Sequence, residues 1–341
     1  MKKIAIISPA AIGDIISISP LLRKLKRVYP NSRVNLYSYD GGFIENTKID
    51  LLDEIITYGR ITKIPLLFKQ KLDILIGWGG LTRPLGYPKN FFYSLLITSL
   101  RAEKKIFYKS TEFPALRHIN VCRLKLDILK KIDININESD YEPFIPFSFV
   151  EESYNIKIFL KNSVFHENTP KVVFHIGANK GVYSRMWSEK KWAEVVKFLV
   201  KQYKANVFFI GSYVDVDKTE KVIKLLDVPV INVVNKFTIP QTTALINEAD
   251  LFISTNSGPM WIANALRVPQ VVLCGPSKEC WYPYIDGNRK IGIVRKKIDR
   301  KFCNPPCDDK QCRYGDNLCM KKIRVTDVIE AIKQLSALKS N

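Results

Sequence analysis

The sequence lacks three features that define common protein classes. No apolar run approaches the roughly 20 residues needed to span a bilayer, so we expect no transmembrane helix. None of the usual nucleic-acid-binding motifs occurs, and we expect no nucleic-acid partner. The apolar stretch at the amino terminus contains Asp14, which argues against a signal peptide and for a cytoplasmic protein. With 46% hydrophobic and 25% charged residues among 341, the composition is that of a globular protein.

Acidic side chains are few compared with basic ones. The chain has 33 Asp and Glu against 53 Lys and Arg, a net charge of +20. Residues 1–150 carry 23 basic and 14 acidic side chains, and residues 151–341 carry 30 and 19, so the excess is spread over both halves. This charge favours an anionic partner, such as an acidic membrane surface or a phosphorylated substrate. The alternative is a Lys-rich surface that only keeps the protein soluble.

Short apolar runs alternate with helical patterns along the chain. Such alternation predicts parallel sheets covered by helices on both faces. The expected strands are 3–8, 33–39, 73–77, 105–108, 171–176, 205–210, 230–234, 251–254 and 270–274. The expected helices are 15–29, 91–100, 119–131, 189–203, 218–226, 240–249, 259–266 and 325–338.

The alternation is interrupted once, which divides the chain in two. It fades between residues 133 and 148, where Pro143 and Pro146 break a polar stretch, and then resumes as though from the beginning. We therefore predict an α/β protein with two doubly wound Rossmann-like domains, 1–150 and 151–325, and a terminal helix in 326–341 that packs across them. Ligands of such sheets bind beyond the carboxyl ends of the strands, so we expect a cleft between two facing domains.

The stretch Ser254–Ala263 has the features of an anion-binding turn between a strand and a helix. Asn256 and Ser257 are helix-capping residue types, and Pro259 suits the first helical position. The unpaired amides at such a helix start attract phosphate, and Gly258 would let a ligand approach the backbone. A well-capped turn without a ligand is the alternative.

Loops that follow the first strand of each half carry further candidates. In the first half, Gly13 and Asp14 lie at a helix start, where a carboxylate is stabilised in its charged form and serves either as a cap or as a proton acceptor. His118 precedes another helix and either faces a substrate or is a polar residue at a helix start. In the second half, the backbone of Gly177 and Asn179 would contact phosphate, for the same reason as the turn in Ser254–Ala263: backbone amides in a loop after a strand attract an anion.

Four of the seven cysteines are clustered near the carboxyl terminus. Cys303, Cys307, Cys312 and Cys319 have the spacing C-x3-C-x4-C-x6-C within a polar loop. Four thiolates so close together would hold a structural zinc or iron. The spacing lacks the paired C-x2-C knuckles of a common zinc site, so free thiols or a redox-dependent crosslink are the alternatives. We expect no catalytic role for this cluster.

Five short motifs, taken together, resemble those of a known family. They are Ala11-Ile12-Gly13-Asp14, Ile18-Ser19-Pro20-Leu21-Leu22-Arg23-Lys24-Leu25, Tyr29-Pro30, Ser257-Gly258-Pro259-Met260 and Gly275-Pro276-Ser277. In order and approximate spacing the set resembles glycosyltransferase family 9, which contains the bacterial lipopolysaccharide heptosyltransferases. The resemblance implies a GT-B fold, with the acceptor on the N-terminal domain and the nucleotide sugar on the C-terminal one. It also implies an inverting transfer without a metal, in which Asp14 is the general base.

The resemblance also implies donor-binding residues. Arg185 takes the place of the family's lysine that precedes a tryptophan by two positions, and its fork of donors suits phosphate. Asp215 resembles the family's acid that accepts hydrogen bonds from ribose hydroxyls, although a simple helix-start acid would look the same. The family's Asp and His are replaced here by Asn256 and Trp261, so the donor could differ from ADP-heptose. The implied donor-binding residues are Gly177, Asn179, Arg185, Asp215, Thr255, Asn256, Ser257, Gly258, Pro259 and Met260.

These features favour an inverting glycosyltransferase that moves a heptose, or a related sugar, from a nucleotide-sugar donor to the lipopolysaccharide inner core. ADP-heptose is the favoured donor, the acceptor is a lipid-linked oligosaccharide or lipopolysaccharide core with Gly13 and His118 on its side, and catalysis requires no cofactor. We expect the protein to act peripherally at the cytoplasmic face of the bacterial inner membrane. The alternative is a non-catalytic nucleotide-sugar-binding scaffold in glycan assembly. A nucleotide-sugar epimerase is disfavoured because no G-x-G-x-x-G fingerprint follows the first strand.

Overall fold

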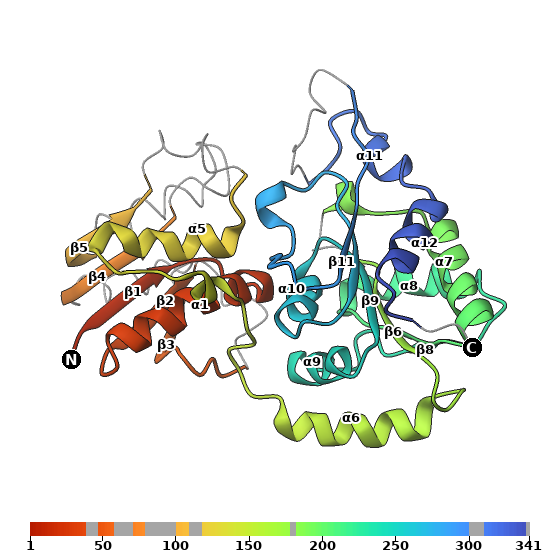
Figure 1. Cartoon of the computed structure of the whole chain (residues 1–341), viewed down its shortest axis with the longest axis horizontal. Helices are drawn as coiled ribbons and strands as arrows, with labels where there is room; N and C mark the ends of the chain where they lie inside the picture. Colours follow the sequence, from red (N-terminus) through yellow and green to blue (C-terminus); the bar gives the residue numbers. More distant parts are fainter. Residues whose placement is uncertain are drawn as a thin grey trace. The chain divides into compact units, whose positions relative to one another are not determined.

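The chain forms two compact units, Met1–Phe147 and Ser148–Asn341 (Figure 1). The computed structural model describes residues 1–38, 47–57, 71–78, 100–108, 118–177, 182–299 and 310–338. Within these residues each unit is built on one sheet, and every strand pair is parallel. The prediction of two doubly wound α/β sheets is therefore confirmed.

The N-terminal unit contains a sheet with the strand order β3-β2-β1-β4-β5. Its strands are β1 (Lys3–Ile7), β2 (Arg33–Ser38), β3 (Glu54–Thr57), β4 (Lys71–Gly77) and β5 (Arg101–Phe107). Its described helices are α1 (Ile12–Val28) and α5 (Val121–Asp127), followed by 3₁₀ turns over Ile128–Ile132 and Glu138–Tyr141. Buried apolar side chains of β1, β2 and β4, such as Ile7, Tyr37 and Leu75, pack together into one core cluster on this sheet.

Helix α1 continues through an internal proline with a local repair. Pro20 lacks the N–H that would bond the carbonyl of Ile16, and the Ser19 hydroxyl donates to that carbonyl instead, at 2.8 Å. Ser19 in turn accepts the backbone N–H of Phe144 at 3.0 Å. The helix therefore stays continuous and is anchored to the end of its own unit.

The C-terminal unit has the strand order β11-β10-β9-β6-β7-β8, the doubly wound arrangement in which the order reverses between β9 and β6. Its strands are β6 (Lys171–His175), β7 (Asn206–Phe209), β8 (Ile231–Asn232), β9 (Leu251–Thr255), β10 (Gln270–Leu273) and β11 (Ile291–Val294). Its described helices are α6 (Val150–Ser163), α7 (Glu189–Tyr203), α8 (Val216–Ile223), α9 (Ile239–Asn247), α10 (Gly258–Ala265), α11 (Leu318–Lys321) and α12 (Val325–Gln334).

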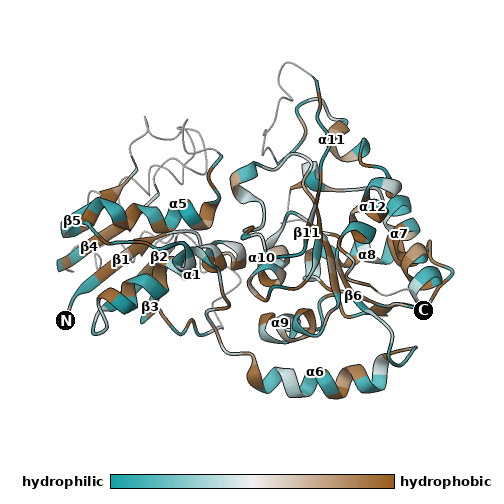
Figure 2. Ribbon diagram, in the orientation of Figure 1, coloured by the Kyte–Doolittle hydropathy of each residue, from teal (hydrophilic) through white to brown (hydrophobic). Residues whose placement is uncertain are grey.

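The core of the C-terminal unit extends to the carboxyl-terminal helix. Figure 2 shows the central strands as largely hydrophobic and the helices around them as mixed. Val328 and Ile332 of α12 are buried in the same cluster as Trp192 of α7 and Val271 of β10. The apolar face of α12 thus belongs to the core of its own unit, and its packing across the two domains stays a prediction.

Most expected elements are present, and the misses lie at particular places. Strands β3 and β11 and helix α6 had no counterpart among the expected elements, and β5 begins four residues before the expected strand. The expected helix 119–131 is α5 followed by a 3₁₀ turn. Residues 91–99 of another expected helix lie outside the described residues.

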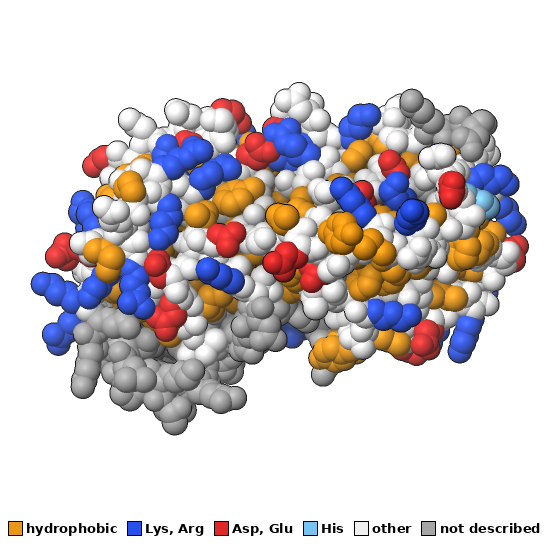
Figure 3. Space-filling view, turned by 90° about the horizontal axis from the view of Figure 1, so that it is seen from below, with side chains coloured by type: hydrophobic (Ala, Val, Ile, Leu, Met, Phe, Trp, Pro, Cys, Tyr) orange, Lys and Arg blue, Asp and Glu red, His pale blue; other side chains and the backbone are white. Residues whose placement is uncertain are grey.

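Basic side chains are spread over the surface. Figure 3 shows Lys and Arg scattered across the face drawn there, on both units, among acidic and apolar side chains. Among the helices that the structure describes, none combines the length and apolar content needed to cross a membrane.

Candidate active site

The first candidate group lies where β1 leads into α1. The strand ends at Ile7 and the helix begins at Ile12, so Asp14 stands in the first helical turn, at the carboxyl edge of the sheet. The side chain of Asp14 is 17% exposed, and the adjacent Gly13 is also partly exposed. The positive end of the helix dipole favours an ionised carboxylate at this position. Asp14 is therefore a charged group that remains accessible from solvent.

A buried lysine on α5 accompanies Asp14. Lys125 Nζ lies 3.6 Å from Asp14 Oδ1 and donates a hydrogen bond to Ser17 Oγ at 2.7 Å. Burial lowers the pKa of Lys125, and the Asp14 carboxylate opposes that shift. Sequence reasoning missed this residue, because one lysine on a helix gives no signal that it points inward.

His118, predicted on the acceptor side, precedes α5 and is exposed. The residue that caps α5 is Asn120, whose side chain accepts the Cys122 N–H at 3.0 Å. His118 is thus placed before the helix, outside the cap itself.

The second candidate group surrounds the turn from β9 to α10. Ser257 is the N-cap residue of α10, but its side chain makes no capping hydrogen bond, contrary to the capping expected from its residue type. Its hydroxyl faces His175 Nδ1 at 2.9 Å instead. Gly258 and Pro259 at the helix start are partly exposed, whereas Thr255 and Met260 on either side are fully buried. The Ser257 side chain therefore does not occupy the first-turn amides of α10, and backbone amides at a helix start are suited to bind an anion.

Arg185 is attached to this turn. It ends the 3₁₀ turn Tyr183–Arg185, and its Nη1 donates to the backbone carbonyl of Asn256 at 2.8 Å. The Asn256 side chain donates to the carbonyl of Trp281 at 3.1 Å, which orients its amide. Trp261, where the family pattern has a histidine, is 3% exposed and fills apolar space in the unit. A guanidinium therefore stands beside the start of α10.

Asp215 lies at the neighbouring strand ends, between two glycines. A Cβ on Gly177 would come within 1.7 Å of Asp215 Oδ1, and one on Gly211 within 2.8 Å of Asp215 Oδ2. Asp215 Oδ2 accepts the Ser212 N–H at 2.8 Å and lies 3.6 Å from His175 Nε2. Burial alone would raise the pKa of Asp215, but His175 and the Ser212 hydrogen bonds outweigh it and lower that pKa.

His175 therefore links two residues implied as donor-binding, since Ser257 and Asp215 lie on opposite sides of its ring. The structure brings Gly177 into the same group: Thr255 Oγ1 donates to the Gly177 carbonyl at 2.6 Å. Asn179 lies outside the described residues.

Lys218 on α8 is a second buried lysine that sequence reasoning missed. It is 4% exposed, and its ammonium has no hydrogen-bond partner among the described residues. Burial lowers its pKa to about 8, although Glu189 and Asp215 attract the charge. Burial of an ammonium group is costly, and the attraction of these two carboxylates offsets that cost only in part, since the pKa of Lys218 stays lowered.

Comparison with known proteins decides the family. The family model "Glycosyltransferase family 9 (heptosyltransferase)" matches residues 147–315, which include the β6, β7 and β9 strand ends. Lipooligosaccharide heptosyltransferase 2 of Campylobacter jejuni is 23% identical over 351 aligned positions, covering 98% of this chain and 99% of that protein. The chain belongs to glycosyltransferase family 9. As a member of this family it is a heptosyltransferase-like glycosyltransferase.

Solved structures confirm the GT-B fold of this glycosyltransferase. A family 9 glycosyltransferase from Veillonella parvula superposes with a TM-score of 0.70 at 19% identity, covering 98% of this chain and 97% of that one. The E. coli ADP-heptose lipopolysaccharide heptosyltransferase II superposes with a TM-score of 0.67 at 19% identity, with 98% of each chain covered.

The cysteine cluster of this glycosyltransferase is only partly described. Cys303 and Cys307 lie outside the described residues, whereas Cys312 and Cys319 are half-buried on one segment. Cys312 Sγ lies 3.7 Å from Asp316 Oδ1. Within the part of the chain that the structure describes, no three metal-ligating side chains are grouped.

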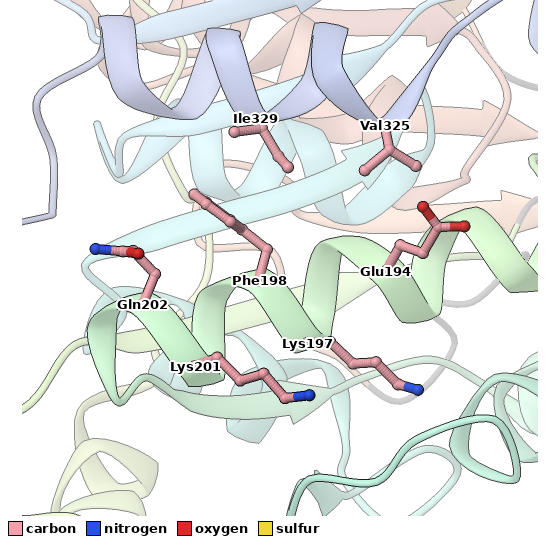
Figure 4. Close-up of a pocket in the computed structure, with 7 residues that line it drawn as sticks. All are labelled: Glu194, Lys197, Phe198, Lys201, Gln202, Val325 and Ile329. Carbon is pink, nitrogen blue, oxygen red and sulfur yellow. The ribbon is translucent and has the colours of Figure 1, made fainter.

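A surface hollow of the C-terminal unit is lined by residues other than those of the candidate groups. Its lining residues come from α7 and α12, rather than from the turns after the strands: Glu194, Lys197, Phe198, Lys201, Gln202, Val325 and Ile329. Figure 4 shows Phe198 and Ile329 directed into the space between the helices, whereas Lys197 and Lys201 point away from α12. None of these residues belongs to the family motifs, so the hollow is not part of the candidate active site.

Proposed function

We propose that this glycosyltransferase moves a heptose, or a related sugar, from a nucleotide-sugar donor to the lipopolysaccharide inner core, with ADP-heptose as the favoured donor. The names of its relatives, a lipooligosaccharide heptosyltransferase and an ADP-heptose lipopolysaccharide heptosyltransferase, support this substrate class. The observation that carries the proposal is the partly exposed Asp14 carboxylate at the start of α1, beyond the carboxyl end of β1.

Asp14 is the general base of the proposed reaction. Its carboxylate takes the proton from the acceptor hydroxyl while the hydroxyl oxygen attacks the anomeric carbon of the donor. The bond between that carbon and the diphosphate oxygen breaks in the same step, and its electron pair leaves with the nucleoside diphosphate. Attack from the opposite face inverts the anomeric centre. Proton transfer of this kind contributes about 10²–10⁴-fold to the rate.

The start of α10 and Arg185 stabilise the leaving diphosphate. Charge develops on the departing oxygen, and first-turn amides together with a guanidinium are donors suited to it. Arg185 is already oriented by its bond to the Asn256 carbonyl, so less side-chain freedom is lost when the donor binds. Asp215 and Gly177 form the adjoining wall, where we place the ribose. Catalysis then needs no cofactor.

Asn256 and Trp261 leave the nucleotide open to test. We would titrate the protein with ADP, GDP, UDP and ADP-heptose by calorimetry. Selective binding of the adenine compounds supports a heptosyltransferase that uses ADP-heptose. Preference for another nucleotide would mean a different donor for the same type of reaction. Absence of binding to any of them contradicts the proposal.

Replacement of the base separates an enzyme from a non-catalytic donor-binding scaffold. In Asp14→Asn we expect kcat to fall about 10²–10⁴-fold while the donor Kd is unchanged, because the amide keeps the shape but cannot accept the proton. The matched control is Asp217→Asn, an exposed carboxylate on α8 that pairs with Lys221 at the surface. Equal turnover by D14N and the wild type would contradict the assignment of the base.

We also propose that the protein works at the cytoplasmic face of the bacterial inner membrane, where its lipid-linked acceptor is found. The net charge of +20 supports attraction to acidic lipid. Co-sedimentation with vesicles of acidic lipid should decrease as salt rises and should be absent with neutral vesicles. Equal binding to both vesicle types would contradict an electrostatic contact.

The cysteine cluster is proposed to hold a structural zinc or iron. Thiolates suit either metal. The segment that carries Cys312 and Cys319 is bonded to the Arg185 turn, because the Lys310 carbonyl accepts the Ser184 N–H and Asn317 donates to the Tyr183 carbonyl, both at 3.0 Å. The metal would therefore stabilise the donor side without taking part in the reaction. Elemental analysis of the wild type and of Cys312→Ser tests this, and a metal-free wild type would refute it.

A further inference from the structure

Lys125 brings a buried positive charge to Asp14 from another helix. Its side chain is 5% exposed, and the distance from Nζ to Asp14 Oδ1 is 3.6 Å. Removal of an ammonium group from water is costly unless its charge is used by a partner. Because Asp14 is separated from Lys125 by 111 positions in the chain, this contact exists only in the folded unit.

The ammonium is held at a fixed position by uncharged groups. Lys125 donates to Ser17 Oγ at 2.7 Å, and the Ser17 hydroxyl donates to the Asp14 backbone carbonyl at 2.8 Å. The ring of Trp78 lies 5.4 Å from Nζ on the side of β4, where an aromatic face tolerates a cation. The lysine is thus bonded to the same turn of α1 that carries the carboxylate.

We propose that Lys125 is a positioning residue that keeps the Asp14 carboxylate ionised and fixed at the start of α1. This inference rests on the proposed function, in which Asp14 is the base. An opposite charge within about 4–6 Å favours the ionised form of a carboxylate by about 1–3 pKa units. Lys125 therefore extends to lower pH the range over which the base can accept the acceptor proton.

Further ionisable groups lie on the described elements that pack against α1 and α5. Cys122 lies on the same helix and attracts the Lys125 charge less than Asp14 does. The charged and titratable groups on α1, α5 and the 3₁₀ turns Ile128–Ile132 and Glu138–Tyr141, which pack against these helices, are Arg23, Lys24, Lys26, Arg27, Arg123, Asp127, Lys130, Lys131, Glu138, Asp140 and Tyr141. Asp140 is paired with Lys24 at 2.7 Å, and Glu138 is paired with Arg123.

The test is the pH profile of kcat in Lys125→Gln and Lys125→Arg at saturating donor and acceptor. Gln still offers a hydrogen-bond donor to Ser17 but carries no charge, whereas Arg keeps the charge. We expect the acidic limb to move upward by about 1–3 pH units in K125Q and to return toward the wild-type position in K125R. The loss in K125Q should therefore be tenfold or more on that limb and should vanish at alkaline pH.

Two matched controls accompany these variants. Lys26→Gln removes a lysine that pairs with Asp53 at 3.0 Å near the other end of α1, about 18 Å away at 1.5 Å per residue, and we expect no shift. His118→Gln is included because histidine ordinarily titrates between pH 5 and 8. An acidic limb that disappears in H118Q would assign the titration to His118 and overturn the proposal.

A structural role alone gives a different result. If K125Q lowers kcat by the same factor at every pH, or changes only KM or thermal stability, Lys125 serves packing and the proposal fails. Should K125Q not fold, the carboxyl titration of Asp14 is followed by ¹³C NMR in the wild type and in Lys125→Met, whose unbranched apolar side chain suits a buried position, with D14N identifying the signal. A higher midpoint in K125M than in the wild type supports the proposal, and equal midpoints overturn it. Absence of sugar transfer by the wild type would instead contradict the proposed function.

Discussion

Gly177 leaves room for the Asp215 carboxylate, and an added methyl group at this position tests that contact. A Cβ on Gly177 would lie 1.7 Å from Asp215 Oδ1 and 2.6 Å from its Cγ, well inside contact distance. Asp215 cannot move away freely, because its other oxygen accepts the Ser212 N–H at 2.8 Å and the Ser212 hydroxyl at 3.1 Å. In Gly177→Ala, either the backbone at residue 177 or the Asp215 side chain must therefore be displaced.

The expected loss of stability follows from those two contacts. Forcing an extra methyl group into a packed site typically costs about 1–3 kcal/mol. Loss of a hydrogen bond to a charged group costs about 1.5–3 kcal/mol. Because the two contributions describe one rearrangement, they do not simply add. We expect the free energy of unfolding of the C-terminal unit to fall by about 3 kcal/mol.

Urea denaturation followed by tryptophan fluorescence measures this change. Trp78 is the single tryptophan of the N-terminal unit, and the other four of the five lie in the C-terminal unit, so the signal reports mainly that unit. The control is Gly287→Ala: its φ of +82° disfavours a side chain, but no atom lies within 4 Å of the added Cβ. The control should lose about 1–2 kcal/mol from its backbone conformation alone.

A double-variant cycle identifies the partner. Asp215→Ala removes Oδ1 and Cγ and leaves only a Cβ at 3.4 Å from the added methyl group, so the double variant G177A/D215A should be more stable than the sum of the two single losses by at least about 1 kcal/mol. Equal stability of G177A and the wild type, or strict additivity with D215A, would refute the contact that the structure places between Gly177 and Asp215.

Two further variants test buried charges in the C-terminal unit. Lys218→Met is expected to raise the free energy of unfolding by up to about 3 kcal/mol at pH 7, because burial lowers the pKa of Lys218 to about 8 and the folded wild type holds an unfavourable charge below that pH. Above pH 8, Lys218 of the wild type loses its proton on folding. The difference in free energy of unfolding between K218M and the wild type, measured by urea denaturation, should therefore be smaller at pH 9.5 than at pH 7. A difference that does not change with pH would contradict a buried ammonium. Asp327→Asn is expected to cost about 1–2 kcal/mol at pH 7, because Asp327 accepts the Arg324 N–H at the start of α12 and pairs with Lys296 at 2.9 Å. Burial would raise the pKa of Asp327, but these partners lower it, so its contribution is present above about pH 4 and lost as pH falls. Urea denaturation at pH 7 and pH 3 should show that difference shrinking, and a difference that persists at pH 3 would argue for packing instead.

The sequence predicted the central elements of the fold better than its edges. Helix α7 was predicted over the residues it occupies, Glu189–Tyr203, because its buried face recurs at helical spacing behind Ser188. Edge strand β5 was predicted only in its last part, since Arg101, Glu103 and Lys104 are exposed and break the apolar run. Helix α6 was missed for a related reason: it buries only Ile156 and Leu160, and its other apolar residues do not form one face.

The candidate site likewise has parts that the sequence predicted and parts that it did not. The turns after β1 and β9 could be predicted because glycine, proline and capping residues mark strand-to-helix junctions in the sequence. Lys125 and Lys218 could not, because a lysine in a helix usually lies in solvent. Their burial depends on helices that pack against them from elsewhere in the fold, such as α1 against α5.

Asp14 and Asp215 look alike in the sequence, since each is an acid that follows a strand and precedes or enters a helix. The structure separates them by their partners. Asp215 forms a capping box with Ser212 and is 4% exposed, so the role of a helix-start acid accounts for its geometry even without a donor. Asp14 is more exposed, and its partner is a buried lysine on another helix. A carboxylate that must receive a proton from a substrate needs both accessibility and a neighbour that favours its ionised form, and of the two acids Asp14 alone combines them.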